Sequence, residues 1–181
     1  GTDLFDALFS KHRILKDTEK LAALVSINIL NALSYLEKES IAHRDIKPEN
    51  IMVDFDGNMF LIDFGLSESM LNTRCINPSG TQGFLSPECF NRDLYCRESL
   101  SKSDIWSLGV TLLNILTRQN PFERWRLMSD KFDASVFNDA ETLIDSVSTM
   151  ISTGMKDLLM QMLTMDCDKR PRADDLLNVK F

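Results

Sequence analysis

The stretch "HRDIKPEN" occupies residues 43–50, and "DFG" follows at residues 63–65. The first stretch crowds acidic, basic and amide side chains into eight positions. Pro48 interrupts any regular helix there, because proline lacks a backbone N–H donor and clashes with the preceding turn. We therefore predict a loop whose polar side chains serve chemistry rather than the exposed face of a helix.

Four side chains in these stretches carry polar groups that active sites use. Asp45 can orient a hydroxyl group or accept its proton, and Lys47 supplies a point cation. Asn50 and Asp63 carry oxygen atoms, which are the ligands that Mg²⁺ takes in proteins. Each residue alone also has a structural explanation, since an Asp beside a turn often caps the loop. Only their joint spacing favours a catalytic site.

The composition is that of an ordinary globular domain. The 181 residues are 44% hydrophobic and 26% charged, which predicts one domain with its own core. No apolar run approaches the roughly 20 residues of a membrane span, and no secretory signal is found. We therefore expect a cytoplasmic or nuclear protein without a membrane partner. The net charge of −7 argues against binding to nucleic acid, and the four cysteines lack metal-type spacing.

The hydrophobic pattern predicts a mostly helical chain. Apolar residues recur at helical spacing over 17–38, with Asp17 or Thr18 as the cap. Two short apolar runs flank Asp56-Gly57 and predict a β-hairpin over 51–62. We also predict a long loop over 66–87, an apolar central helix over 103–117, short helices within 123–150, and a last helical pair over 154–165 and 173–179.

The two opening stretches resemble the catalytic loop and the metal-binding triplet of eukaryotic protein kinases. Seven specified residues at this spacing match by chance at about one position in 10⁹. The resemblance continues in order along the whole chain. "GTQGFLSPE" at 80–88 is similar to the substrate-positioning segment, "SDIWSLGV" at 103–110 is similar to the central helix, and Arg170 matches a late-domain arginine.

This resemblance implies a mainly α fold, namely a protein-kinase-like C-lobe over 1–181 with one short β-hairpin. Its catalytic loop would be 43–50 and its activation segment 63–88. Because the sequence has no GxGxxG or VAIK-like segment, we expect the N-lobe to be absent. We then expect the chain alone to be inactive, with the missing N-lobe of the same kinase as its partner. A kinase-derived binding or scaffold module without catalysis stays open as the alternative.

The resemblance also implies an activity, the transfer of the γ-phosphate of ATP to Ser or Thr of protein substrates in the presence of Mg²⁺. Lys47 and Thr81 favour the serine/threonine branch, in which the threonine hydrogen-bonds the catalytic Asp and Lys. The implied catalytic residues are Asp45, Lys47 and Thr81. The implied cofactor-binding residues are Asp3, Leu4, Lys47, Glu49, Asn50 and Asp63, of which Asn50 and Asp63 hold the metal.

Within that set, Asp3 would contact the nucleotide ribose, and Leu4 would lie beneath the adenine. Glu49 is also the position that in some kinases favours basic residues upstream of the target hydroxyl. Other matches imply structural roles. His43 and Phe64 would pack beneath the site, Glu88 and Arg170 would form an ion pair, and Asp104 would accept hydrogen bonds from the backbone of the catalytic loop.

The remaining implied roles concern regulation of the long loop. Arg44 matches the residue that in many kinases pairs with a phosphate on the activation loop, and Thr73 and Ser79 are the candidate acceptors. Glu68 stands where a second basic residue is often found, so an unregulated loop stays open as well. The segments "SPEC", "KSDIWSLGV", "LLNILT" and "NPF" are similar to a fungal group of kinases linked to nutrient sensing and meiosis.

Overall fold

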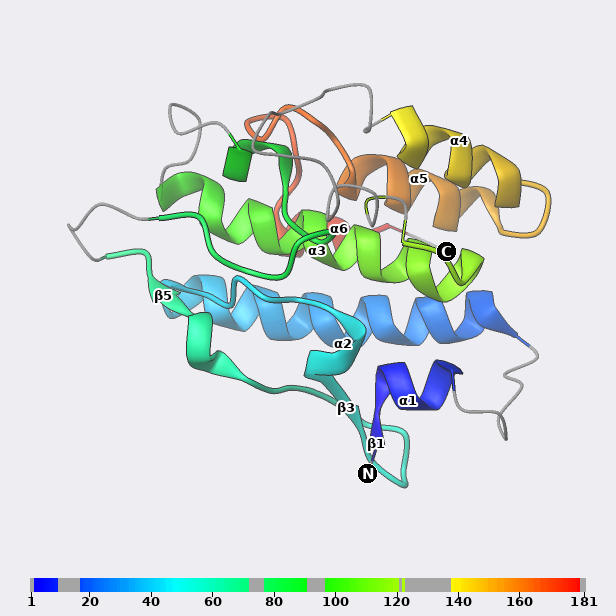
Figure 1. The fold of residues 1–181 in the computed structure, drawn as a ribbon, viewed down its shortest axis with the longest axis horizontal. Helices are drawn as coiled ribbons and strands as arrows, with labels where there is room; N and C mark the ends of the chain where they lie inside the picture. The colour runs from blue at the N-terminus through cyan, green and yellow to red at the C-terminus, as the bar shows by residue number, and fades with distance from the viewer. Residues whose placement is uncertain are drawn as a thin grey trace.

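The computed structural model describes residues 2–9, 17–71, 77–90, 97–120, 122 and 138–179. Two long helices form its centre, α2 (Thr18–Lys38) and α3 (Arg97–Thr117), and they pack along each other (Figure 1). Two shorter helices, α4 (Asn138–Val147) and α5 (Thr153–Met162), contact α3, and the single turn α6 (Ala173–Leu176) contacts α2.

Helix α2 confirms the helix predicted over 17–38. Asp17 is its N-cap, and the Asp17 carboxylate accepts a hydrogen bond of 2.9 Å from the backbone N–H of Lys20. This bond satisfies one of the donors that a helix leaves free at its start. The inward face buries apolar side chains at three- and four-residue intervals, among them Val25, Ile29 and Leu33.

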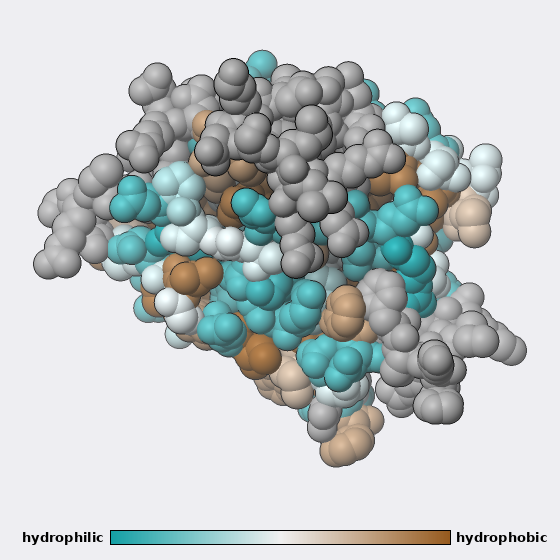
Figure 2. Space-filling view, in the orientation of Figure 1, coloured by the Kyte–Doolittle hydropathy of each residue, from teal (hydrophilic) through white to brown (hydrophobic). Residues whose placement is uncertain are grey.

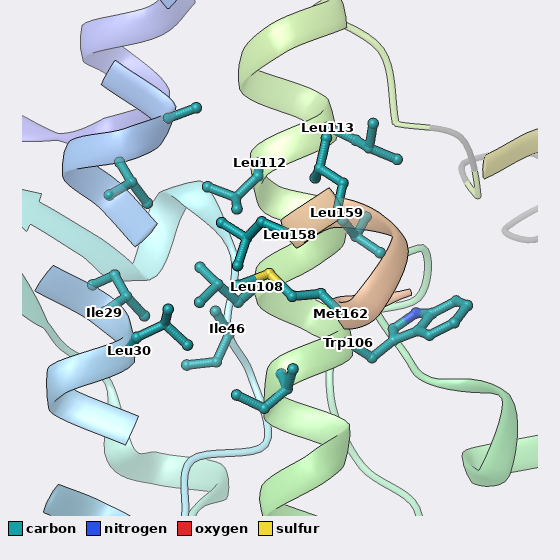
Figure 3. Close-up of a cluster of buried hydrophobic side chains, with 14 of the residues drawn as sticks. Ile29, Leu30, Ile46, Trp106, Leu108, Leu112, Leu113, Leu158, Leu159 and Met162 are labelled. Atoms are coloured by element: carbon teal, nitrogen blue, oxygen red, sulfur yellow. The ribbon is translucent and has the colours of Figure 1, made fainter. Parts of the chain in front are cut away.

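Helix α3 begins at Arg97, earlier than the predicted start at Ser103. Its apolar residues are buried on several sides, because α2 lies on one side and α5 on another (Figure 3). Gly109 allows the close approach of α5, since a Cβ atom at this position would lie 2.9 Å from Cβ of Met162. The labelled side chains of Figure 3 show this contact region, in which Leu108 and Leu158 are fully buried.

The sheets are larger than the single predicted hairpin. Strands β3 (Ile51–Val53) and β4 (Met59–Leu61) form that hairpin, and β1 (Thr2–Asp3) pairs antiparallel with β3 to give the order β1-β3-β4. A second sheet joins β2 (Ile41–Ala42) to β5 (Glu68–Ser69). The expected fold with one hairpin was therefore wrong. The additional strands are two residues long, too short to show the alternation that identifies a strand.

The shorter elements complete the fold. Helix α1 (Leu4–Phe9) follows β1 directly, and short 3₁₀ turns occupy η1 (Pro48–Asn50), η2 (Phe64–Leu66) and η3 (Pro87–Phe90). The last helical pair is confirmed as α5 and α6, although α6 is shorter than predicted. In the described part of the chain, no helix has the length and apolar character needed to cross a membrane.

Candidate active site

The polar residues of the two opening stretches lie at the ends of the small sheets. Asp45, Lys47 and Asn50 belong to the connection between β2 and β3, which contains η1, and Asp63 follows β4. The backbone N–H of Ile62 donates to the carbonyl oxygen of Asn50 at 3.0 Å, so the hairpin holds the two stretches together. In the orientation of Figure 1, hydrophilic side chains gather near the middle of the face that Figure 2 shows.

Asp45 is the centre of a hydrogen-bonded group. Lys47 Nζ lies 2.8 Å from Asp45 Oδ2 and 2.7 Å from Thr81 Oγ1. The backbone N–H and the hydroxyl of Thr81 both donate to Asp45 Oδ1, at 2.9 and 2.7 Å. Asn50 Nδ2 donates to the carbonyl and to Oδ2 of Asp45, both at 2.9 Å. The structure therefore brings Asp45, Lys47, Asn50 and Thr81 together.

These bonds keep the Asp45 carboxylate charged. Asp45 is 6% exposed, and burial alone would raise its pKa. The hydrogen bonds from Lys47 and Thr81 and the charge of Lys47 outweigh this burial, so the pKa of Asp45 is lowered from its ordinary value. Asp45 is consequently an ionised hydrogen-bond acceptor at neutral pH, which is the form that can orient a hydroxyl group.

Asn50 and Asp63 have free oxygen atoms for a metal ion. Because both Asn50 hydrogen bonds use Nδ2, its carbonyl Oδ1 has no hydrogen bond among the described residues. Asp63 is exposed, has a left-handed backbone with φ of 60°, and accepts a single bond of 3.2 Å from the Gly65 N–H. Two such oxygens fit Mg²⁺, which binds few carboxylates and takes its other ligands from phosphates and water.

Asp104 of α3 fixes the start of the catalytic loop. Its two carboxylate oxygens accept hydrogen bonds of 2.7 Å from the backbone N–H groups of His43 and Arg44. Complete burial raises the pKa of Asp104 to about 7, although these two bonds and the nearby Arg44 oppose the shift. The His43 ring is bonded to the Ile62 carbonyl at 3.0 Å and meets the Phe64 ring edge-on, with centroids 4.8 Å apart.

The buried His43 predicts a pH dependence of stability. Burial lowers the pKa of His43 below its ordinary 6.5, so the unfolded chain binds the proton more readily. The His43 contribution to the free energy of unfolding is therefore present above about pH 6.5 and lost as the pH falls through the folded-state pKa. Urea unfolding between about pH 7.5 and pH 5 should show a smaller loss of stability for His43→Gln than for the wild type.

Two controls separate His43 from other groups. The raised pKa of Asp104 acts in the opposite direction, because it stabilises the folded protein as the pH falls, but it is present in both proteins and cancels in their difference. A His12→Gln variant, which changes the other histidine of the sequence, is the matched substitution against which the pH dependence of His43→Gln is compared. Equal pH dependence in wild type and His43→Gln would contradict this assignment.

Glu88 and Arg170 form a fully buried, two-bonded ion pair. Arg170 Nη1 lies 2.7 Å from Glu88 Oε1, and Nη2 lies 3.1 Å from Oε2. Arg170 also donates to the carbonyl oxygens of Thr164 and Lys102 at 3.0 and 2.8 Å, and its guanidinium lies 5.1 Å from the centre of the Trp106 ring. This pair ties η3, at the end of the predicted activation segment, to the helical core.

Arg44 contacts the predicted activation loop. Its Nη2 donates to the carbonyl of Asn77 at 2.6 Å and to the hydroxyl of Ser79, and its Nη1 lies 3.5 Å from Glu68 Oε2. Ser79, one of the two candidate phosphate acceptors, is therefore beside Arg44. Thr73, the other candidate, lies outside the described residues.

The expected nucleotide-binding residues at the start of the chain are built into the fold. Asp3 Oδ1 accepts a hydrogen bond of 2.7 Å from the Asp6 N–H, and Asp3 pairs with Met52 across the sheet. Leu4 is 1% exposed and belongs to the hydrophobic core, so little of its side chain is open to a ligand. Glu49 lies in η1 and is exposed.

Sequence reasoning missed the contact between Glu68 and Arg44. From the sequence, Glu68 stood out only because a basic residue is often found at this position. An acidic side chain there also indicated that a cation could lie nearby. The contact could not be predicted because the two residues are far apart in the sequence, and the pairing of β2 with β5 brings them together only in the folded protein.

Comparison with known proteins identifies relatives along the whole chain. The protein kinase domain family matches residues 1–181. A probable serine/threonine-protein kinase, mkcF of Dictyostelium discoideum, is 32% identical over 181 residues, which are all of this chain and 25% of that protein. The MAP kinase kinase mkk-4 of Caenorhabditis elegans is 34% identical over 97% of this chain and 49% of its own length. The chain thus spans about a quarter to a half of these relatives.

The family match corrects the expected fold class. It runs from residue 1 to residue 181 and is not restricted to a C-lobe, so the expectation that the N-lobe is absent was wrong. At the start of the chain, β1 pairs with β3 and Leu4 is buried in the core. The family match along the whole sequence shows that the chain belongs to the protein kinase domain family.

Proposed function

We propose that this protein is a serine/threonine protein kinase, which transfers the γ-phosphate of ATP to Ser or Thr hydroxyl groups of protein substrates. The observation that carries the proposal is the position of Lys47 Nζ between Asp45 and Thr81, at 2.8 and 2.7 Å. The protein kinase family supports it, as do the relatives whose names include serine/threonine-protein kinase and MAP kinase kinase. The fungal subgroup suggested by the sequence and the cytoplasmic or nuclear location stay predictions.

The proposed roles follow from the hydrogen bonds. Asp45 is held ionised by Lys47 and Thr81, so it can accept a hydrogen bond from the substrate hydroxyl and turn its oxygen toward the phosphate. Lys47 carries a positive charge beside Asp45 and stabilises charge that develops on the transferred group. Thr81 fixes both side chains, which limits the motion that would otherwise misplace the hydroxyl.

A bound Mg²⁺ would neutralise phosphate charge during transfer. Asn50 and Asp63 would hold it, since each offers a carboxylate or amide oxygen that is not used by a hydrogen bond within the described residues. No group of three His, Cys, Asp or Glu side chains that could hold a metal ion occurs in the described part of the chain. The remaining ligands of such an ion would be phosphate oxygens of the nucleotide and water molecules.

The preference for Ser and Thr is tested with peptides that differ only in the acceptor. We expect phosphate incorporation into a serine or threonine peptide at least about tenfold faster than into the matched tyrosine peptide, because a tenfold ratio requires only about 1.4 kcal/mol of difference in barrier. An equal or higher rate with the tyrosine peptide would contradict the assignment to this branch.

Removing the charge of Asp63 should weaken the coupling between Mg²⁺ and ATP. With Asp63→Asn, we expect the Mg²⁺ concentration that supports half-maximal ATP binding to rise by about tenfold or more, because a carboxylate ligand is replaced by a neutral amide. Calorimetric titration with ATP at several Mg²⁺ concentrations measures this shift. Asp56→Asn, a change in the exposed hairpin turn, is the control, and an unchanged Mg²⁺ requirement in Asp63→Asn would exclude Asp63 as a ligand.

A further inference from the structure

Glu68 lies beside the residue that precedes Asp45. It begins strand β5, which pairs antiparallel with β2 so that Glu68 is opposite Ala42. The strand that leads into the catalytic loop is therefore hydrogen-bonded to the strand that carries Glu68. Across this small sheet, Glu68 Oε2 lies 3.5 Å from Arg44 Nη1, and the two side chains are 28% and 7% exposed.

Arg44 is a buried cation that requires an anion nearby. Its Nη2 bonds are to a neutral carbonyl and to the neutral Ser79 hydroxyl, and its Nε is buried without a hydrogen-bond partner in the described part of the chain. The backbone N–H of Arg44 is held by Asp104. Among the described residues, Glu68 has the carboxylate that lies within ion-pair distance of the Arg44 guanidinium. Removing the partner of a buried charge is strongly unfavourable.

The Arg44 guanidinium is connected to Asp45 through the loop that it holds. It bonds Asn77 and Ser79, and Gly80 follows with φ of 136°. A Cβ atom at Gly80 would lie 2.6 Å from the Arg44 carbonyl oxygen, so glycine permits the loop to pass directly over the Arg44 backbone. The next residue, Thr81, donates two hydrogen bonds to Asp45.

We propose that Glu68 is a positioning residue for the phosphotransfer site. Its carboxylate, rather than a phosphate on the loop, is the anion that holds Arg44, and Arg44 in turn holds residues 77–81 against Asp45. This inference rests on the proposed function, because it concerns the same site. It implies that turnover does not depend on phosphorylation of the loop, since the positive charge of Arg44 is already paired within the fold.

The test compares single and double variants after phosphatase treatment. Glu68→Gln keeps the shape of the side chain and removes its charge, so we expect kcat to fall about tenfold or more while KM for ATP stays within about twofold. Glu68→Asp should retain part of the activity. In a protein that already carries Arg44→Gln, Glu68→Gln should cause no further loss of kcat, because the effects of substitutions at residues that act through one another do not add. Asp145→Asn, in an exposed ion pair with Lys156, is the matched control.

A second readout does not need enzyme activity. Hydrogen exchange of the amides of residues 77–81 should become faster in Glu68→Gln and remain nearly unchanged in Asp145→Asn, because only the first variant releases Arg44. If the wild type shows no turnover, the proposed function fails, and the exchange measurement still decides the role of Glu68. Unchanged exchange, an equal loss in the Arg44→Gln background, or loss of wild-type turnover after phosphatase treatment would overturn the inference.

Discussion

Replacing Asp45 with Asn is expected to reduce kcat by about two to four orders of magnitude, the range that a positioned acid or base contributes. The substitution removes the charge that orients the substrate hydroxyl, but it preserves the size of a side chain whose oxygens accept bonds from Thr81 and Lys47. ATP affinity should change little, because Asp45 is not an expected metal ligand. Steady-state phosphorylation of a serine peptide measures the first quantity, and calorimetry measures the second.

The control for this experiment is a surface carboxylate of the same type. Asp166→Asn changes an exposed residue paired with Lys169 and should leave kcat within about twofold, because exposed ion pairs of this kind contribute little. If Asp45→Asn kept the turnover of the wild type, Asp45 would not be the residue that acts on the hydroxyl. A loss of ATP affinity that matched the loss of kcat would instead assign Asp45 to nucleotide binding.

Replacing Arg170 with Met is expected to destabilise the protein by about 3–5 kcal/mol, which is the cost of leaving one charge of a buried pair without its partner. Glu88 is completely buried and has Arg170 as its two-bonded partner. The same substitution removes the contact between the Arg170 guanidinium and the Trp106 ring. Urea unfolding followed by circular dichroism measures the change in the free energy of unfolding.

A paired substitution separates the unpaired charge from lost packing. Glu88→Gln combined with Arg170→Met removes both charges, so it should recover part of the stability lost in Arg170→Met alone. Lys169→Met, which breaks the exposed ion pair with Asp166, should have little effect. An Arg170→Met protein as stable as the wild type, or a double variant less stable than the single one, would contradict this account of the buried pair.

The helices and the hairpin could be predicted because their signals are local. Helix α2 shows both a cap at Asp17 and a continuous apolar face, and the turn at Gly57 has a φ of 88°, as expected for a hairpin residue that favours glycine. The start of α3 was missed because residues 97–102 are largely polar, although Leu100 is fully buried. Strands β1, β2 and β5 were missed because each has two residues, and their partners are distant in sequence.

The sequence predicted those residues of the candidate site that lie close together in one segment of the chain. Asp45, Lys47 and Asn50 are close in sequence, so their contacts depend mainly on the turn at η1. Thr81 was named only through resemblance to a family, and its two bonds to Asp45 require the folded loop. The acidic side chain of Glu68 indicated a partner cation, but its pairing with Arg44 depends on the register between two short strands.

The most direct measurement of the central claim is phosphate transfer in a single turnover. The protein is mixed in excess over Mg²⁺-ATP with a peptide that contains one serine, and the peptide is analysed by mass spectrometry. We predict that the γ-phosphate appears on the serine hydroxyl and that the amount of phosphopeptide equals the amount of ATP consumed. Binding of Mg²⁺-ATP without any transfer to the peptide would contradict the claim and favour a non-catalytic binding module.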